Sequence, residues 1–181
     1  MAAGQQYKIK RMTSNEEIKK KAQKISLLLT DIDGVLTDNG VYYGAGGEEL
    51  KRFSVRDGMG VERLNKLCQV ETGFVTGETS PSVMKRAEKL NIKELHLGIK
   101  NKLQIVNQII ESRRIAPEEI AFIGDDVNDL EAMARVGLCA SPANAMHMVK
   151  QQVHYVCNEK GGEGCFREFA ELIINCKTEK Q

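Results

Sequence analysis

One stretch of the chain, residues 25–38, constrains the fold more than any other. It reads Ile-Ser-Leu-Leu-Leu-Thr-Asp-Ile-Asp-Gly-Val-Leu-Thr-Asp. Its apolar run at residues 27–29 has the length of a fully buried strand, and Asp31 and Asp33 follow directly before a glycine. Ligands of open α/β sheets bind outside the carboxyl ends of the strands. The stretch therefore predicts a buried strand that presents Asp31 as a nucleophile or a metal ligand.

Strand-like and helix-like segments alternate along the remaining chain. Further strands are expected at residues 70–75, 94–97, 121–123, 137–140 and 153–157. Helices are expected at residues 14–25, 57–67, 79–90, 103–114, 130–134, 143–150 and 165–176. Ser14 with Glu17 has capping-box spacing for the first of these, and Thr79 or Ser80 is expected to cap the third. Such alternation implies right-handed crossovers and a parallel sheet. We predict an α/β domain with a doubly wound, Rossmann-like sheet.

A β-hairpin is predicted between the first strand and the first long helix. Residues 41–43 and 50–53 are strand-like and flank a glycine-rich turn at residues 44–47. We expect this hairpin to project from the edge of the sheet. A two-stranded ribbon is marginally stable alone in water, so a neighbouring subunit is a natural surface for it to pack on.

Length, charge and cysteine content exclude several classes of protein. The 181 residues fit one domain, expected at residues 14–176 between a disordered tail at 1–13 and a polar tail at 177–181. A net charge of +1 argues against nucleic acid and membrane surfaces as partners. No apolar run approaches the roughly 20 residues that span a bilayer, and no secretion signal is evident, so we expect a cytoplasmic protein. Five cysteines without a Cys-x-x-Cys pair favour reduced thiols over disulfides or zinc.

Three predicted strands end in polar groups of complementary kinds. These groups are Asp31 with Asp33, Thr76 with Gly77, and Asp125 with Asp126 and Asp129. Two carboxylates 4 Å apart repel by about 1 kcal/mol in water and about 4 kcal/mol at an effective dielectric constant of 20, so the acids need a cation. Ligands that are all oxygen select a hard metal such as Mg²⁺. The alternative, solvated aspartates in turns, suits one such motif better than two.

The motifs resemble those of the haloacid dehalogenase (HAD) superfamily. The matching segments, in order and spacing, are residues 31–38, 76–77, 102 and 124–129. The fuller resemblance is to its 3-deoxy-D-manno-octulosonate (KDO) 8-phosphate phosphatase family. That family's hairpin, its Asp-Gly before a helix and its Gly-Gly-x-Gly-x-x-Arg-Glu segment recur here, the last at residues 161–168. The resemblance covers residues from about 14 to 172.

The resemblance implies a Mg²⁺-dependent phosphatase that works through an aspartyl phosphate. Asp31 would attack phosphorus, and Asp33 would protonate the leaving sugar oxygen and then activate water. The Asp31 carboxylate, the Asp33 backbone carbonyl and Asp125 would hold Mg²⁺. The other phosphoryl oxygens would be neutralised by Thr76, the Gly77 amide and Lys102. Asp126 and Asp129 are expected to assist around the metal, and a solvated lysine at a helix start is the alternative for Lys102.

The chain has no room for the cap domain that most members of the superfamily carry. The intervals at residues 38–76 and 77–102 are already filled by the hairpin and single helices. The family's answer to an open crevice is a homotetramer in which a neighbouring subunit closes the site. Arg56 and Arg167 are candidates for binding the substrate carboxylate, because arginine pairs well with carboxylates. A purely structural arginine is the alternative at both positions.

Glu78 bears on the choice of substrate. KDO 8-phosphate phosphatases commonly carry arginine after the Thr/Ser-Gly pair, whereas this chain carries an acceptor for hydroxyl or amine groups. Together with Arg86 and Lys89, Glu78 resembles the pattern of phosphatases of nine-carbon acids. 2-Keto-3-deoxynononate (KDN) 9-phosphate or sialic acid (N-acylneuraminate) 9-phosphate is therefore favoured, with KDO 8-phosphate as the alternative.

Two other functions stay open. In some sialic acid activating enzymes a similar domain has lost its acids and serves as an oligomerisation module. Intact Asp31, Asp33, Asp125 and Lys102 argue against that function here. A phosphatase of unrelated small phosphoesters would instead show comparable rates on generic substrates.

Overall fold

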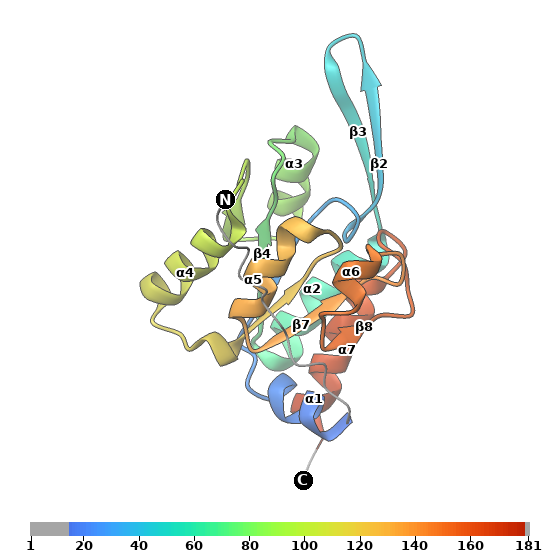
Figure 1. Ribbon diagram of the computed structural model, residues 1–181. Coiled ribbons are helices and arrows are strands. Elements are labelled where there is room, and N and C mark those ends of the chain that lie inside the picture. The colour runs from blue at the N-terminus through green and yellow to red at the C-terminus, as the bar shows by residue number, and fades with distance from the viewer. Residues whose placement is uncertain (1–14, 180–181) are drawn as a thin grey trace.

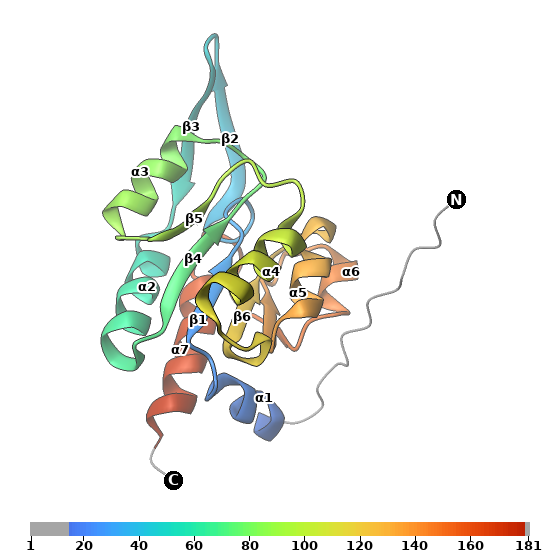
Figure 2. The ribbon, with the colours of Figure 1, turned by 90° about the vertical axis from the view of Figure 1, so that its left-hand side faces the viewer.

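Six parallel strands form the central sheet of the computed structural model, which describes residues 15–179 (Figures 1 and 2). Their order is β5-β4-β1-β6-β7-β8, and every neighbouring pair is parallel. The strands are β1 (Leu27–Thr30), β4 (Glu71–Val75), β5 (Glu94–His96), β6 (Ile120–Ile123), β7 (Leu138–Ser141) and β8 (Tyr155–Val156). The predicted doubly wound α/β fold is confirmed.

Helices cover both faces of this sheet. They are α1 (Asn15–Ala22), α2 (Val55–Cys68), α3 (Pro81–Lys89), α4 (Lys102–Arg113), α5 (Leu130–Arg135), α6 (His147–Lys150) and α7 (Cys165–Thr178). Short 3₁₀ turns lie at Pro117–Glu119 and Val127–Asp129. Ser54, Ser80 and Asn101 cap α2, α3 and α4 by accepting backbone N–H groups with their side chains. Ser80 is one of the two predicted caps of α3.

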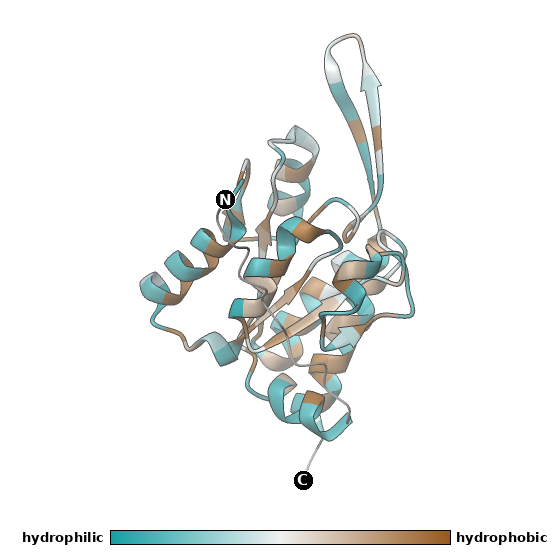
Figure 3. Ribbon diagram, in the orientation of Figure 1, coloured by the Kyte–Doolittle hydropathy of each residue, from teal (hydrophilic) through white to brown (hydrophobic). Residues whose placement is uncertain are grey.

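The continuous apolar character of β1 follows from its central position. Leu28 belongs to a core cluster shared with α1, α2, α3 and α7, whereas Leu27 and Leu29 belong to a second cluster shared with α4, α5 and α6. A strand with both faces covered reads as an apolar run instead of an alternation. Hydrophobic residues accordingly concentrate on the strands and the inner sides of the helices (Figure 3).

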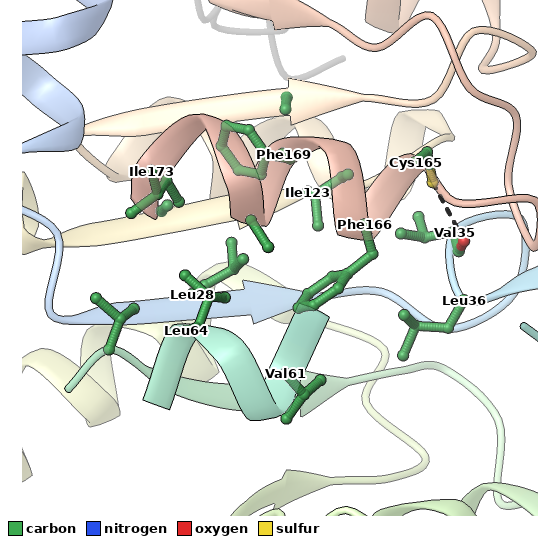
Figure 4. Close-up of a cluster of buried hydrophobic side chains, with 14 of the residues drawn as sticks. Leu28, Val35, Leu36, Val61, Leu64, Ile123, Cys165, Phe166, Phe169 and Ile173 are labelled. Carbon is green, nitrogen blue, oxygen red and sulfur yellow. Dashed lines mark hydrogen bonds between the residues drawn. The ribbon is translucent and has the colours of Figure 1, made fainter. Parts of the chain in front are cut away.

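Helix α7 packs against α2 and the sheet through fully buried aromatic rings. The Phe166 ring points from α7 toward α2 and β1 (Figure 4), whereas the Phe169 ring stacks on Tyr155 of β8 with ring centroids 6.3 Å apart. At the start of α7 the Cys165 thiol donates to the Val35 carbonyl, 3.3 Å away, in the loop after β1. The start of α7 is thereby fixed against the loop after β1.

The predicted hairpin is present as β2 (Thr37–Gly44) and β3 (Gly47–Phe53), paired antiparallel. It extends well beyond the sheet (Figures 1 and 2). Tyr42, Tyr43 and Leu50 are 63%, 74% and 62% exposed. No separate cap domain is inserted within residues 15–179.

Some boundaries differ from the predictions. The helix predicted at residues 143–150 is only α6, because the N–H groups of Ala143 and Met146 bond to the carbonyls of Glu159 and Asp125 in a turn. The last predicted strand shortens to β8, and α7 continues beyond residue 176 to Thr178. The predicted tail at 1–13 and the capping role of Ser14 lie outside the described residues. Across residues 15–179 there is no helix with the length and apolar character needed to cross a membrane.

Candidate active site

The carboxyl ends of β1, β4 and β6 meet at one edge of the sheet, because β1 pairs with both other strands. A cleft of about 350 Å³ opens there. It is lined by Asp31, Asp33, Asn39, Thr76, Gly77, Glu78, Asp125, Asp126, Val127 and Asn128. The three polar strand ends singled out in the sequence therefore share one cleft.

Three carboxylates and one lysine form a cluster at this edge of the sheet. Carboxylate oxygens of Asp31, Asp125 and Asp129 lie within 4.8 Å of one another. The Lys102 ammonium lies 2.9 Å from Asp31 Oδ1 and 2.6 Å from Asp129 Oδ1, and its side chain is 1% exposed. The alternative of a solvated Lys102 is therefore wrong.

Burial and mutual repulsion change the acidity of this cluster. Burial, together with the charge of Asp129, raises the pKa of Asp31 to about 7 against the opposing effect of Lys102. Burial and the charge of Asp31 likewise raise the pKa of Asp125 to about 7. Burial alone would lower the pKa of Lys102, but Asp31 and Asp129 outweigh it and raise that pKa. The cluster carries more negative charge than one lysine offsets.

The donor set fits Mg²⁺. Asp129 is fully buried, and its oxygens accept from Lys102 and from the N–H groups of Asp125 and Asp126. Asp31 and Asp125 line the cleft, so their carboxylates are the ones presented to an ion there. Oxygen ligands and excess negative charge are what a hard divalent cation requires.

Asp33 lines the cleft but stands outside the cluster of Asp31, Asp125 and Asp129. Its Oδ1 accepts from the Thr37 hydroxyl at 3.2 Å, and its Oδ2 lies 2.5 Å from the ammonium of Lys51 on β3. The sequence did not indicate Lys51. Neighbouring residues of a strand point to opposite faces, so the pattern predicts that Leu50 faces the protein and that Lys51 faces solvent. Asn39 and Asn128 also line the cleft without having been singled out.

Thr76 and its neighbours form the wall contributed by β4. Thr76 is buried, and its hydroxyl accepts the N–H of Glu78 at 3.2 Å. Gly77 and Glu78 are exposed at the rim of the cleft. Asp126, on the opposite wall, accepts the N–H of Val127 at 2.6 Å and so holds the 3₁₀ turn that carries Asp129.

Three arginines predicted to bind substrate lie elsewhere in the single subunit. Arg86 donates to the Ser54 carbonyl at 2.8 Å and stacks over the Phe53 ring. Arg167 pairs with Glu171 at 2.7 Å. Arg56 and Arg167 line a second hollow, next to residues 158–159 and 163–164. The structure does not bring these three side chains to the cleft that holds Asp31.

The glycine-rich segment at residues 161–164 packs behind the loop after β1 (residues 31–36), which we call the catalytic loop because it carries Asp31 and Asp33, the predicted catalytic residues. The Gly162 N–H donates to the Val35 carbonyl at 2.9 Å, and Gly161 packs directly on the Gly34 carbonyl. Gly162 has a φ of +67°, a conformation that favours glycine, and a Cβ there would collide with the backbone at residues 37–38. Side chains are excluded at both positions because backbone packs on backbone.

Asp57 fixes the start of α7 from the first turn of α2. Its Oδ1 accepts the N–H of Arg167 at 2.9 Å, so a carboxylate of one helix caps another. Burial raises the pKa of Asp57 to about 6. The Asp-Gly pair noted in the sequence thus joins α2 to the segment behind the catalytic loop.

Comparisons with known proteins agree with this geometry. The profile of the haloacid dehalogenase-like hydrolases matches residues 64–168, more than half of the chain. The KDO 8-phosphate phosphatase of Escherichia coli strain B is 39% identical over 158 residues, covering 87% of this chain and 84% of that protein. The chain belongs to this phosphatase family. The Yersinia pestis member is 37% identical over 159 residues, covering 88% of this chain and 84% of that protein.

Solved structures of the KDO 8-phosphate phosphatase family share the fold closely. The Moraxella catarrhalis enzyme, in complex with a magnesium ion, a phosphate ion and KDO, superposes with a TM-score of 0.87 at 32% identity, covering 91% of this chain and 94% of that one. The cobalt-bound Haemophilus influenzae enzyme superposes with a TM-score of 0.84 at 36% identity, covering 87% of this chain and 91% of that one. The chain is therefore a HAD phosphatase whose carboxylate cluster suits Mg²⁺.

Proposed function

We propose that the chain hydrolyses the terminal phosphate of a 3-deoxy-2-ulosonic acid phosphate, with KDO 8-phosphate as the first candidate. The observation that carries the proposal is the cleft that Asp31 and Asp125 share with Thr76 and Gly77. The substrate named for the relatives supports the eight-carbon acid. This ranking reverses the sequence-based preference for nine-carbon acids, for which the relatives give no support.

The chemistry proceeds in two transfers. Asp31 attacks phosphorus while Asp33 gives a proton to the departing sugar oxygen, and the P–O ester bond breaks. Asp33 then takes a proton from water as the water oxygen attacks phosphorus and releases Asp31. Asp31, Asp125 and the Asp33 carbonyl would hold Mg²⁺, which would supply positive charge to offset that of the phosphoryl group.

Thr76, Gly77 and Lys102 complete the phosphoryl site in this proposal. Thr76 and the Gly77 amide lie on the cleft wall, and Lys102 already holds Asp31 in place. Donors fixed before the substrate arrives stabilise charge in the transition state without reorganisation. Asp129 acts through Lys102 and the N–H groups of Asp125 and Asp126, and Asp126 acts through the turn at Val127–Asp129.

A homotetramer is part of the proposal. The exposed Tyr42, Tyr43 and Leu50 of the hairpin offer an apolar surface for another subunit. Arg56 and Arg167 line a hollow away from their own cleft, so any contact of theirs with a substrate carboxylate would be made in a neighbour's cleft.

A nine-carbon sugar acid phosphate is the second candidate. Glu78 favours it, because this exposed carboxylate stands at the rim of the cleft next to Gly77. A carboxylate there accepts hydrogen bonds from hydroxyl or amine groups but repels a substrate carboxylate.

The test is phosphate release with Mg²⁺ from KDO 8-phosphate, KDN 9-phosphate, N-acetylneuraminate 9-phosphate and p-nitrophenyl phosphate. Wild type should prefer KDO 8-phosphate, and Asp31→Asn should lose at least ~10³-fold in kcat because an amide is not a nucleophile. Glu111→Gln, which also replaces a carboxylate by an amide but at an exposed position of α4, should leave turnover unchanged. Preference for a nine-carbon substrate, reversed by Glu78→Arg, would select the second candidate. Comparable rates on all four substrates would contradict both.

A further inference from the structure

Lys51 interrupts the expected pattern of the hairpin. It lies on β3 between Leu50, which is 62% exposed, and Arg52, which is also exposed. The Lys51 side chain itself is 0% exposed. A hairpin built only for packing would turn its leucine inward and its lysine outward, because a buried ammonium is unfavourable unless it is paired. The inversion points to a use for the cation.

The partner of Lys51 is the acid that faces the cleft. The ammonium lies 2.5 Å from Asp33 Oδ2, while the Thr37 hydroxyl donates to Asp33 Oδ1 at 3.2 Å. Thr37 in turn accepts the N–H groups of Gly34 and Asn39, both at 3.3 Å. Each oxygen of the Asp33 carboxylate is therefore held by a group that is itself fixed.

A second contact extends this arrangement to the wall of the cleft. Lys51 lies 3.4 Å from Glu48 Oε2, and Glu48 Oε1 accepts from the hydroxyl of Ser80. Ser80 caps α3 and follows two residues after Glu78. The ionic chain Asp33–Lys51–Glu48 thus joins the catalytic loop, the hairpin and the segment that carries Thr76 and Gly77.

We propose that Lys51 is a positioning residue for Asp33, which makes the hairpin part of the catalytic apparatus. It holds the carboxyl group in the one orientation that serves both transfers: toward the ester oxygen that takes the proton, and then toward the water that gives one up. Lys51 touches neither substrate nor phosphorus in this role. The inference rests on the proposed function of Asp33 as acid and base.

A purely structural role makes a different prediction. If Lys51 only anchored the hairpin, its removal would slow every substrate by the same factor, since the whole cleft would be disturbed. If it positions Asp33, the loss depends on the leaving group. A sugar alkoxide needs a proton to depart, whereas p-nitrophenolate departs without one.

The experiment compares Lys51→Met, Lys51→Arg and Asp33→Asn with wild type in rapid mixing with Mg²⁺. The substrates are KDO 8-phosphate and p-nitrophenyl phosphate. For Lys51→Met we expect kcat on KDO 8-phosphate to fall ~10–100-fold with KM within ~3-fold, because general acid–base catalysis contributes ~10²–10⁴-fold. The initial burst of nitrophenolate should keep its wild-type rate while the later steady state slows, as water attack on the aspartyl phosphate becomes limiting. Lys51→Arg should restore most of the loss.

The controls separate the possible failures. Lys66→Met, the same change at an exposed lysine of α2, should match wild type, and circular dichroism should show all variants folded. A burst slowed as much as KDO 8-phosphate turnover in Lys51→Met would overturn the proposal. The decisive quantity is the ratio of kcat on KDO 8-phosphate to the rate of the nitrophenolate burst. If Asp33→Asn changes this ratio and Lys51→Met does not, the proposal for Lys51 is overturned while the role of Asp33 stays intact. A wild-type ratio in Asp33→Asn would overturn the proposed role of Asp33, and that of Lys51 with it.

Discussion

The six-stranded sheet and the two-stranded hairpin distribute their side chains in opposite ways. In β1 every residue is buried and the leucines fill both core clusters. In β3 the buried residue is Lys51, and Leu50 faces outward together with Tyr42 and Tyr43 of β2. The sheet thus holds its apolar residues inside the subunit, whereas the hairpin exposes its own.

This difference separates two sources of stability. The sheet is stabilised by apolar burial that is complete within one chain. The hairpin depends on ionic contacts with the catalytic loop at its base and, in our proposal, on another subunit along its length. Disturbing the core should therefore unfold the chain, whereas disturbing the hairpin should leave the fold and change assembly.

The largest expected effect on stability comes from a substitution in the core next to the six-stranded sheet. Phe166→Ala removes a fully buried ring between α7, α2 and β1. We expect the free energy of unfolding to fall by about 3–5 kcal/mol, because the cavity adds to the lost burial. Urea denaturation measures this change. Leu67→Ala, at a position on α2 that is 46% exposed, is the control and should cost less than about 1 kcal/mol. Equal losses in the two variants would contradict this account of the core.

Removal of Mg²⁺ should have an intermediate effect that depends on pH. At a concentration 100 times its dissociation constant, Mg²⁺ stabilises the folded state by about 2.7 kcal/mol, which chelation at pH 8 should remove. Below pH 7 the Asp31 and Asp125 carboxyls, with pKa values raised to about 7, hold protons that Mg²⁺ must displace. Affinity should therefore fall ~10-fold or more from pH 8 to pH 6. Thermal unfolding with and without chelator, at pH 8 and at pH 6, measures the stabilisation by Mg²⁺ and its dependence on pH. If chelation lowers the unfolding temperature equally at the two pH values, the raised pKa values are contradicted.

The smallest effect on the single chain should come from the hairpin surface. In the double variant Tyr43→Ser with Leu50→Ser, both side chains are already more than 60% exposed. We expect the free energy of unfolding of the dissociated chain to change by no more than about 0.5 kcal/mol. The assembly, followed by analytical ultracentrifugation, should shift to smaller species. An unchanged distribution would place the subunit contacts elsewhere.

The sequence predicted the sheet well because its strands and caps obey local rules. The apolar run of β1 and the Ser80 cap of α3 are each decided by a few neighbouring residues. The helix predicted at residues 143–150 shortened because its first turn bonds to Asp125 and Glu159, which are distant in sequence. Local patterns carry no information on such partners.

In the candidate site too, local patterns predicted some residues, whereas others depend on partners distant in sequence. Asp31 and Asp125 could be placed in one cleft because parallel strands end at a common edge. Lys51 could not be placed there, since its burial depends on two acids, Asp33 and Glu48, at other points of the chain. Arg86, a candidate for binding substrate, donates to the Ser54 carbonyl and stacks over the Phe53 ring, and the local helix pattern predicts neither contact.

The contact between the glycine-rich segment and the catalytic loop has a consequence for synthesis on the ribosome. A nascent chain that ends at residue 160 already contains every proposed catalytic and metal-binding group, from Asp31 to Asp129. It lacks Gly161, Gly162 and Cys165, against which the loop after β1 is packed and hydrogen-bonded. The enzyme should therefore become active only when its last helix has emerged, so that incomplete chains remain inert.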